Sequence, residues 1–412
     1  MRLIEIKRLI WTATVLLVLS GLMTGCGKEP RQASGRLDTP AHHTLRGYDF
    51  LEKGDMGEAN NSFNLALSLD KKYSQAISGK AIVRASKAQD PRMSKDQREE
   101  TFKEARKMFK EALSEAKNDN DKRLAYSAKI RIHRMTREPS DDWLEEAEDA
   151  YKEAVELDPK GRDADPHLFM ARAYRDAYKL QQAQQFYRKV LGMDTNKTGI
   201  ADEELSLVQK IIRAEPGSMH GRIVAFANSL SRADIAGLFI EELRLDKLYQ
   251  RGDRGNVDSS FQAPPSGQDN RFEAEKLVRA PEAVDIKDHP MRADIKEVLR
   301  LKVAGLEPDP SHRFHPDAKT NRAEFSMMVE DILVKVTGET KLRTKFFGQG
   351  SPFRDVRNDL PYFNAVMTVT SRGLIEAKSK VSGMFAPLDP VTGAEALLAI
   401  RLLKDELRSY LR

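Results

Sequence analysis

The sequence predicts an all-α protein with two different helical domains, and three observations support this prediction. Of its 412 residues, 40% are hydrophobic, 32% are charged and 7% are aromatic, which is typical of a soluble, helix-rich protein. A small-aromatic-small pattern recurs in the first half of the chain. In the second half, three longer stretches share another order of elements, in which a glycine-bearing turn follows a first helix and precedes a second. A chain of this length usually forms roughly two or three domains.

The N-terminal segment has the three zones of a secretory signal. Basic residues at positions 2, 7 and 8 precede an apolar run over residues 9–23, and small residues then lead to Cys26, the single cysteine. The apolar run is short for a permanent membrane span. Residues 1–25 are therefore predicted to be a signal peptide, and no disulfide can form within one chain.

The residues Met23-Thr24-Gly25-Cys26 resemble the bacterial lipobox. This resemblance implies cleavage before Cys26, lipid attachment to its thiol and membrane anchoring in the cell envelope, in the outer membrane facing the periplasm if the organism has two membranes. An uncleaved anchor and a plain secretory signal are the alternatives. Residues 26–39 are polar and contain Pro, Gly and Ser, so they are predicted to be a flexible tether.

The first half repeats a small residue, an aromatic residue and another small residue at offsets of four and three, which places all three side chains on one helix face. Small residues let a neighbouring helix approach closely, and the aromatic residue fills the remaining gap. The pattern therefore predicts stacked antiparallel helix pairs. Its four occurrences are Ala59, Phe63, Ala66; Ala105, Phe109, Ala112; Ala147, Tyr151, Ala154; and Ala183, Tyr187, Val190.

Residues 40–196 resemble tetratricopeptide (TPR) repeats, most closely in the first unit with its Gly47, Phe50 and Ala59. This resemblance implies a short superhelix whose concave groove binds a partner protein of unknown identity. A simple spacer is the alternative. The second unit departs from the repeat, because residues 88–100 are predicted to form an insertion in a turn that is normally tight.

The second domain, residues 200–412, contains three degenerate copies of a unit at about residues 202–247, 283–337 and 352–408, with a flexible insertion at 250–282. Each copy is predicted to contain a first helix, a glycine turn, a strand-like element and a second helix that a tetrad opens. The first copy is the weakest match to this order. The tetrads are Ser231-Arg232-Ala233-Asp234, Asn321-Arg322-Ala323-Glu324 and Thr392-Gly393-Ala394-Glu395.

The middle and last copies resemble the S-layer homology repeat, with the residues Asp285, Gly305, Phe314 and Pro316 in the middle copy and Phe353, Asp355, Gly373, Phe385 and Pro387 in the last. The resemblance implies a predominantly helical, pseudo-threefold domain that binds cell-wall polysaccharide or peptidoglycan. The fold class predicted for the whole chain is thus a TPR-type superhelix followed by such a domain.

The candidate ligand-binding residues are Arg232 and Arg322 together with Asp234 and Glu324. A helix N-terminus presents unpaired N–H groups, and an arginine beside it supplies a planar pair of donors for a carboxylate. The resemblance implies that the tetrad arginine meets an acidic group of the saccharide, and Gly393 leaves the last copy without one. The acidic residues also fit capping boxes with their helix-capping residues.

The sequence predicts no enzyme, no cofactor, no metal site and no nucleic-acid partner. It contains no phosphate-binding glycine loop, zinc-type cluster or nucleophile elbow, and the net charge of +5 is a small difference between 68 basic and 63 acidic residues. The leading hypothesis is a lipoprotein that links membrane to wall. The alternative is an assembly or pilotin-like lipoprotein whose TPR groove binds a secreted or outer-membrane client and whose C-terminal repeats are only structural.

Overall fold

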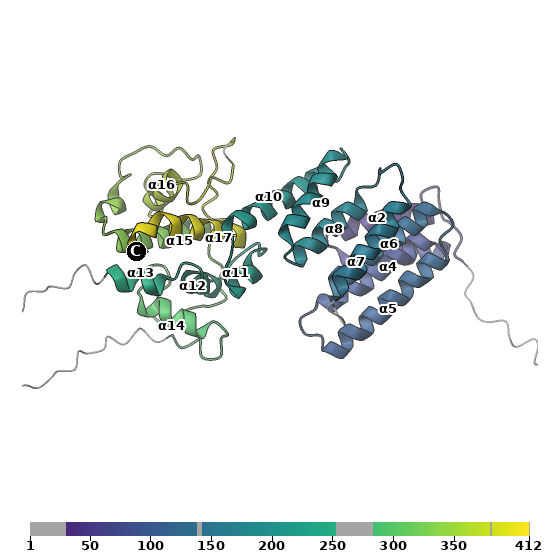
Figure 1. Cartoon of the computed structure of the whole chain (residues 1–412), viewed down its shortest axis with the longest axis horizontal. Coiled ribbons are helices and arrows are strands. Elements are labelled where there is room, and N and C mark those ends of the chain that lie inside the picture. The colour runs from purple at the N-terminus through teal and green to yellow at the C-terminus, as the bar shows by residue number, and fades with distance from the viewer. Residues whose placement is uncertain (1–29, 138–141, 253–282, 380, 412) are drawn as a thin grey trace, which may run out of the picture. The chain divides into compact units, whose positions relative to one another are not determined.

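The computed structural model describes residues 30–137, 142–252, 283–379 and 381–411, and within them it is all-α, as predicted (Figure 1). The chain divides into two compact units, residues 1–201 and 202–412. No helix in the described part is long and apolar enough to cross a membrane. The predicted signal peptide with Cys26, and residues 253–282 of the predicted insertion, lie outside the described residues.

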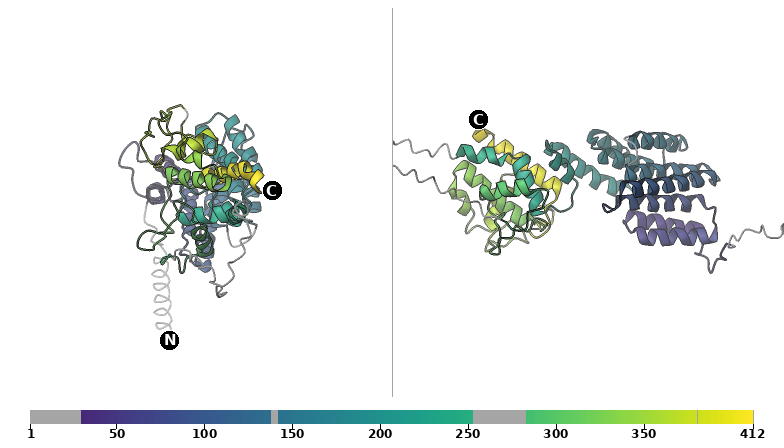
Figure 2. Two further views of the ribbon diagram at one scale, coloured as in Figure 1. Left: turned by 90° about the vertical axis from the view of Figure 1, so that its left-hand side faces the viewer. Right: turned by 90° about the horizontal axis from the view of Figure 1, so that it is seen from below.

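The first unit consists of four antiparallel helix pairs. The first helices of the pairs lie next to one another along the unit, and each packs against the second helix that follows it (Figures 1 and 2). The pairs are α2 (Pro40–Glu52) with α3 (Met56–Leu69), α4 (Ser74–Ser86) with α5 (Lys95–Ser114), α6 (Asp119–Thr136) with α7 (Trp143–Glu156), and α8 (Asp165–Asp176) with α9 (Leu180–Gly192).

The predicted small-aromatic-small pattern lies in the second helix of every pair, and its side chains are buried except for Tyr151, which is partly buried. Phe63 of α3 shows why the small residues are needed. A Cβ atom at Gly47 of α2 would lie 2.5 Å from the Phe63 ring, and one at Gly79 of α4 would lie 2.2 Å from it. Two glycines on neighbouring helices thus make room for one aromatic ring.

The residues of the predicted insertion in the second helix pair are partly helical. A short 3-10 helix (Lys87–Gln89) follows α4, and α5 begins at Lys95. Ser94 and Gln97 form a reciprocal capping box at this N-terminus, so the residues expected to belong to an insertion form the first turns of α5 instead. Residues 95–100 of the predicted insertion are therefore helical, and α5, with 20 residues, is longer than α3, with 14.

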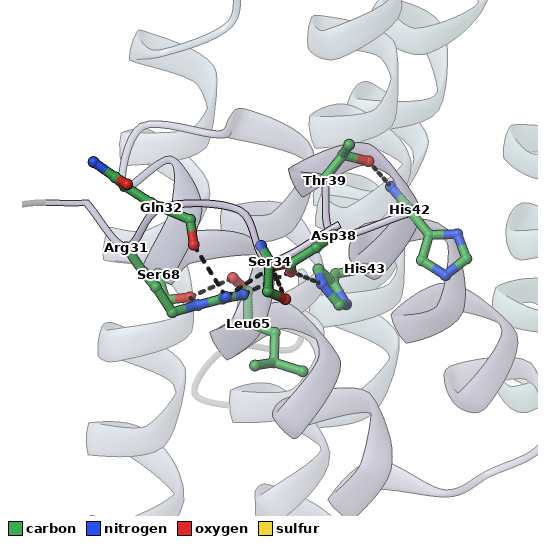
Figure 3. A network of polar contacts seen from close by, with 9 residues as sticks. All are labelled: Arg31, Gln32, Ser34, Asp38, Thr39, His42, His43, Leu65 and Ser68. Carbon is green, nitrogen blue, oxygen red and sulfur yellow. Dashed lines mark hydrogen bonds and ion pairs between the residues drawn. The ribbon is translucent and has the colours of Figure 1, made fainter. Parts of the chain in front are cut away.

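Part of the predicted tether is held against the first unit. Figure 3 shows Asp38 at the centre of a polar network that joins the N-terminal segment to α2 and α3. The carboxylate of Asp38 accepts hydrogen bonds from the guanidinium of Arg31 at 2.6 and 2.7 Å and lies 2.8 Å from Nε2 of His43. The backbone N–H of Arg31 donates to the carbonyl of Ser68 at 2.7 Å. Residues 31–38 are thus part of the folded unit, and flexibility remains a prediction only for residues 26–29.

A buried histidine predicts that the first unit loses stability in mild acid. His133 of α6 is 6% exposed, and burial lowers its pKa from 6.5 to about 4. The unfolded chain therefore binds more protons than the folded chain between these pH values, and the free energy of unfolding falls as the pH drops through this window. The loss attributable to His133 is about 3 kcal/mol once the pH is below both pKa values.

Urea denaturation followed by tryptophan fluorescence at pH 7 and pH 4.5 measures this loss, since Trp143, the tryptophan among the described residues, lies in α7 of the first unit. The variant His133→Phe keeps an aromatic ring beside Phe102, whose ring centroid lies 5.4 Å from that of His133. We expect a smaller difference between the two pH values for this variant. Equal differences for wild type and variant would contradict the prediction.

The second unit contains the three predicted copies. Its second helices are α12 (Arg232–Glu241), α15 (Arg322–Thr337) and α17 (Gly393–Glu406), each of which begins at the second residue of its tetrad. The other elements are α10 (Thr198–Ala214), α11 (Met219–Val224), α13 (Leu245–Gly252), α14 (Arg292–Arg300), α16 (Phe363–Ser371) and the 3-10 helices at Thr340–Thr344 and Leu407–Leu411.

The expected strand-like elements are only single bridges in the structure. Ser231 pairs with Lys319, and Asn321 pairs with Pro390, without a named strand anywhere in the described residues. The first copy differs further, because α11 stands where the other two copies have an extended loop.

Candidate functional site

The three tetrads meet in a closed ring of backbone hydrogen bonds. The N–H of Leu230 donates to the carbonyl of Val391, that of Val391 to Thr320, and that of Thr320 to Leu230, each at 3.0 Å. Each donor is the residue directly before its tetrad, so the ring relates the three copies by a pseudo-threefold axis. This arrangement confirms the expected pseudo-threefold domain and places the N-termini of α12, α15 and α17 around one centre.

Each tetrad is a capping box. The first residue accepts a hydrogen bond from the backbone N–H of the acidic fourth residue, and the acidic side chain accepts one from the first residue's N–H. Oδ2 of Asp234 also accepts from the hydroxyl of Ser231 at 2.7 Å, while Oε2 of Glu324 accepts from the N–H of Asn321 at 3.0 Å. The capping prediction is confirmed. A ligand-binding role of Asp234 and Glu324 remains a prediction.

The two tetrad arginines join each copy to the next. Nε of Arg232 donates to the carbonyl of Phe314 at 2.8 Å, and its two terminal nitrogens donate to the carbonyls of Gly305 and Glu307 at 2.6 and 2.9 Å. The guanidinium carbon also lies 4.8 Å from the centroid of the Phe314 ring. Burial lowers the pKa of this guanidinium.

Arg322 repeats this arrangement one copy further on and is 1% exposed. It donates to the carbonyls of Phe385 and Glu376 at 3.0 and 2.6 Å and to the carboxylate of Glu395 at 2.5 Å, and it lies 4.6 Å from the centroid of the Phe385 ring. Every nitrogen of both arginines therefore has a protein acceptor. Because Arg322 is buried, a direct contact with a saccharide would require the residues that cover it to move, so the geometry favours a structural role for it. For the more exposed Arg232, direct contact remains a prediction.

The aspartates that lead the middle and last copies fix the loops which the arginines bind. Asp285 accepts hydrogen bonds from the backbone N–H groups of Phe314 and His315 at 2.8 and 2.7 Å, and Asp355 accepts them from Phe385 and Ala386 at 3.0 and 2.6 Å. Burial by itself raises the pKa of Asp285, but these two donors outweigh it and the pKa lies below the ordinary value. The first copy lacks this aspartate in its sequence.

Gly393 is the exception among the tetrads for a steric reason. The residue seven positions before the first tetrad residue is equivalent in the three copies. It is Val224 in the first copy, Phe314 in the middle copy and Phe385 in the last copy. Phe314 and Phe385 present their carbonyls to an arginine, but the carbonyl oxygen of Val224 would lie 1.7 Å from a Cβ atom at position 393. The end of α11 thus occupies the volume where a third arginine would begin, which explains why the last copy carries glycine.

The unpaired hydroxyl of Thr320 allows the packing at the ring of backbone hydrogen bonds to be tested. It is 1% exposed, and its hydroxyl has no hydrogen-bond partner among the described residues, whereas Leu230 and Val391 at the equivalent positions are apolar. Replacing Thr320 by valine removes an unsatisfied hydroxyl at nearly constant volume, so we expect the free energy of unfolding to rise by about 1 kcal/mol. Urea denaturation followed by circular dichroism measures this change.

Thr368→Val is the matched control for this substitution. Thr368 is also 1% exposed, but its hydroxyl donates to the Glu330 carboxylate at 3.0 Å, so this variant should be less stable than wild type. Destabilisation by Thr320→Val to the same extent would contradict the assignment of an unpaired hydroxyl.

A cavity of about 570 Å³ is lined in part by Glu376 and Glu395, which accept hydrogen bonds from Arg322. It is lined by α10, by the loop over residues 373–378 and by α17, and it includes Glu395, which Arg322 holds. Four basic side chains line it, from Lys210, Arg213, Lys378 and Arg401, together with three carboxylates, from Glu376, Glu395 and Asp405. The sequence offered no signal for this cluster, because its members come from three segments far apart in the chain.

The basic side chains of this cavity are only partly neutralised. Lys378 lies 3.9 Å from Asp389, and Arg401 lies 3.3 Å from Glu215 and 3.4 Å from Asp405. In the part of the chain that the structure describes, Lys210 and Arg213 have no carboxylate within salt-bridge distance. The cavity can therefore accept an anionic group without displacing an ion pair at α10. The described residues contain no cluster of three or more His, Cys, Asp or Glu side chains arranged to hold a metal ion.

Comparison with known protein families identifies an S-layer homology domain at residues 352–397. The matched range covers the last copy from the segment of Asp355 to the tetrad with Gly393, and it confirms the predicted resemblance there. No curated protein matches the chain. The domain implies cell-wall polysaccharide as a binding partner and the cell envelope as the place of action. For the first two copies, the resemblance remains a prediction.

Proposed function

We propose that this chain, which carries an S-layer homology domain near its C-terminus, is a non-catalytic envelope protein that links a membrane to the wall. Its second unit binds an acidic cell-wall polysaccharide, its TPR-like first unit binds a partner protein, and lipidated Cys26 holds the membrane. The observation that carries the polysaccharide part is the family match at residues 352–397 beside a cavity with four basic side chains.

The cavity offers a different mode of recognition from a direct contact with the tetrad arginine. Lys210 and Arg213 lie one helical turn apart on α10, so both can approach one carboxylate or phosphate group. Leu374, Ile375 and Leu402 supply apolar surface for a sugar ring. Arg322 contributes by positioning, since it holds the Glu376 carbonyl and the Glu395 carboxylate at the wall of the cavity.

Co-sedimentation of the purified protein with wall sacculi tests this proposal. Sacculi are used before and after acid stripping of their attached polysaccharide. Binding should be lost on stripping, and the double variant Lys210→Ala/Arg213→Ala should bind untreated sacculi at least about tenfold more weakly, because two charge-assisted contacts are removed. The double variant Lys296→Ala/Lys341→Ala removes two exposed lysines outside the cavity and should bind as wild type does.

The alternative function is an assembly or pilotin-like lipoprotein whose first unit binds a secreted or outer-membrane client. It predicts the same sedimentation for stripped and untreated sacculi, or none with either. That outcome would reject the wall-binding proposal. Equal binding by the two double variants would reject the cavity as its site while leaving wall binding intact.

A further inference from the structure

Residues 31–38, which we call the N-terminal strap, fix the point at which the chain leaves the first unit. The backbone N–H of Arg31 donates to the carbonyl of Ser68 at the end of α3, and its guanidinium binds the carboxylate of Asp38 (Figure 3). The same carboxylate accepts hydrogen bonds from the N–H and the hydroxyl of Ser34 at 2.6 and 2.8 Å. The strap therefore lies against the end of the first helix pair, where α2 begins and α3 ends.

The strap leaves only a short chain between this end of the first unit and the proposed lipid. Cys26 lies five residues before Arg31. A fully extended chain of five residues spans at most about 18 Å. The helix α2, with its 13 residues, is by itself about 20 Å long. A lipid on Cys26 would therefore keep the strap and the adjoining end of α3 close to the membrane surface.

The helix on which the strap lies carries almost no charge. α3 contains one charged residue, Glu58 in its first turn, and residues 59–69 contain none. The corresponding helices α5 and α7 differ, since charged residues occupy half or more of their positions. An uncharged face can enter the headgroup region of a membrane without removing an ionised side chain from water. The end of α3 thus meets a requirement for membrane contact that α5 and α7 do not meet.

Two leucines beside this contact are exposed. Leu37 of the strap is 69% exposed, and Leu65 of α3 is 43% exposed. Leu65 lies three residues before Ser68, so it is on the same face of α3 as the strap. Arg36 is also exposed, and it can pair with an anionic headgroup. Exposed leucines next to a basic side chain are typical of surfaces that lie in the membrane interface.

We propose that the membrane which carries the lipid of Cys26 binds this face of the first unit, with Leu37 and Leu65 in the headgroup region. The inference rests on the proposed function, in which Cys26 is lipidated, and it adds a second contact with the same membrane. The two contacts reinforce one another, because the short chain between them holds the leucines at a high effective concentration beside the bilayer. The other end of α2, next to Lys53, then points away from the membrane.

Quenching by brominated lipids tests this contact. The chain from Cys26 onward is coupled through this thiol, the single cysteine, to a maleimide lipid in vesicles of phosphatidylcholine and phosphatidylglycerol. Trp143 is then the only native tryptophan, and Trp143→Phe provides the background for one tryptophan probe at a time. We expect phosphatidylcholine brominated near its headgroup to quench the probe of Leu65→Trp at least about twofold more than the probe of Lys53→Trp.

The variant Asp38→Ala tests the role of the strap. It removes the carboxylate that holds Arg31, so the tether becomes longer and the quenching of Leu65→Trp should fall to that of Lys53→Trp. Asp90→Ala is the matched control, because it removes an aspartate that binds Arg92 in the turn before α5. This control should leave the quenching unchanged. Circular dichroism establishes that each variant is folded.

The variant Leu37→Asp tests the apolar contact itself. It places a charge on the proposed membrane face and leaves the carboxylate of Asp38 in place, so it should reduce the quenching of Leu65→Trp. Equal quenching of the two probes, or quenching that survives both Asp38→Ala and Leu37→Asp, would overturn the inference. Absence of quenching would also overturn it and would favour a protein partner for this face. Because the anchor is attached chemically, these outcomes do not depend on lipidation in cells, which incorporation of a labelled fatty acid at Cys26 tests separately.

Discussion

Replacing Gly393 by alanine should destabilise the second unit by at least about 3 kcal/mol. The added Cβ atom would lie 1.7 Å from the carbonyl oxygen of Val224 and 2.7 Å from its carbonyl carbon. Both atoms belong to the backbone at the end of α11, so no side-chain rotation relieves the clash. The backbone of Gly393 is not in the left-handed region, and a glycine-to-alanine change in a helix by itself stabilises by about 0.4–1 kcal/mol. The steric effect is larger, so it decides the sign.

Urea denaturation of the full chain separates this effect from changes in the first unit. The fluorescence of Trp143 follows the first unit, while circular dichroism follows both units. Gly199→Ala is the control, because a Cβ atom at this helical glycine would have no neighbouring atom within 4 Å, so alanine should be tolerated there. Gly393→Arg restores the arginine of the other tetrads and should be more damaging than Gly393→Ala. A stable Gly393→Arg protein with stronger wall binding would contradict this account.

Replacing Arg322 by alanine should destabilise the second unit by about 3–5 kcal/mol, the usual loss when one partner of a buried ion pair is removed. The substitution leaves the Glu395 carboxylate without its cation and the carbonyls of Phe385 and Glu376 without this donor. It also removes the contact with the Phe385 ring. The free energy of unfolding from urea denaturation followed by circular dichroism measures the loss.

The double variant Arg322→Met/Glu395→Gln tests the origin of this loss. It removes both charges and keeps most of the buried volume, so it should be more stable than Arg322→Ala alone. Wall binding is then measured for each variant under conditions in which it is folded. A stable Arg322→Ala protein that no longer binds sacculi would contradict the structural role and support direct contact with the saccharide.

One set of measurements thus distinguishes the role of Arg322 from the role of Lys210 and Arg213 in the cavity. Arg322→Ala is expected to change stability, whereas Lys210→Ala/Arg213→Ala is expected to change affinity and leave stability near that of wild type, because these two side chains have no carboxylate partner among the described residues. A co-sedimentation assay with Arg322→Ala alone would not separate loss of a ligand contact from loss of the fold.

The sequence by itself determined the features that depend on local periodicity. Offsets of three and four identified the buried faces of α3, α5, α7 and α9, since helical geometry relates residues within one turn. The capping boxes of α12 and α15 were predicted for the same reason, because they involve residues three apart.

Only the tertiary structure decided which contacts these elements make with one another. The acceptors of Arg322 lie 54, 63 and 73 residues further along the chain, so no local pattern could show that each of its three guanidinium nitrogens has an acceptor. The same holds for Gly393, whose side-chain volume is occupied by the backbone of Val224, and for the cavity that joins α10 to α17. Distant hydrogen-bond partners and excluded volume are properties of the packed chain, which is why the sequence identified Arg322 and Gly393 but only the fold assigned their roles and revealed the cavity.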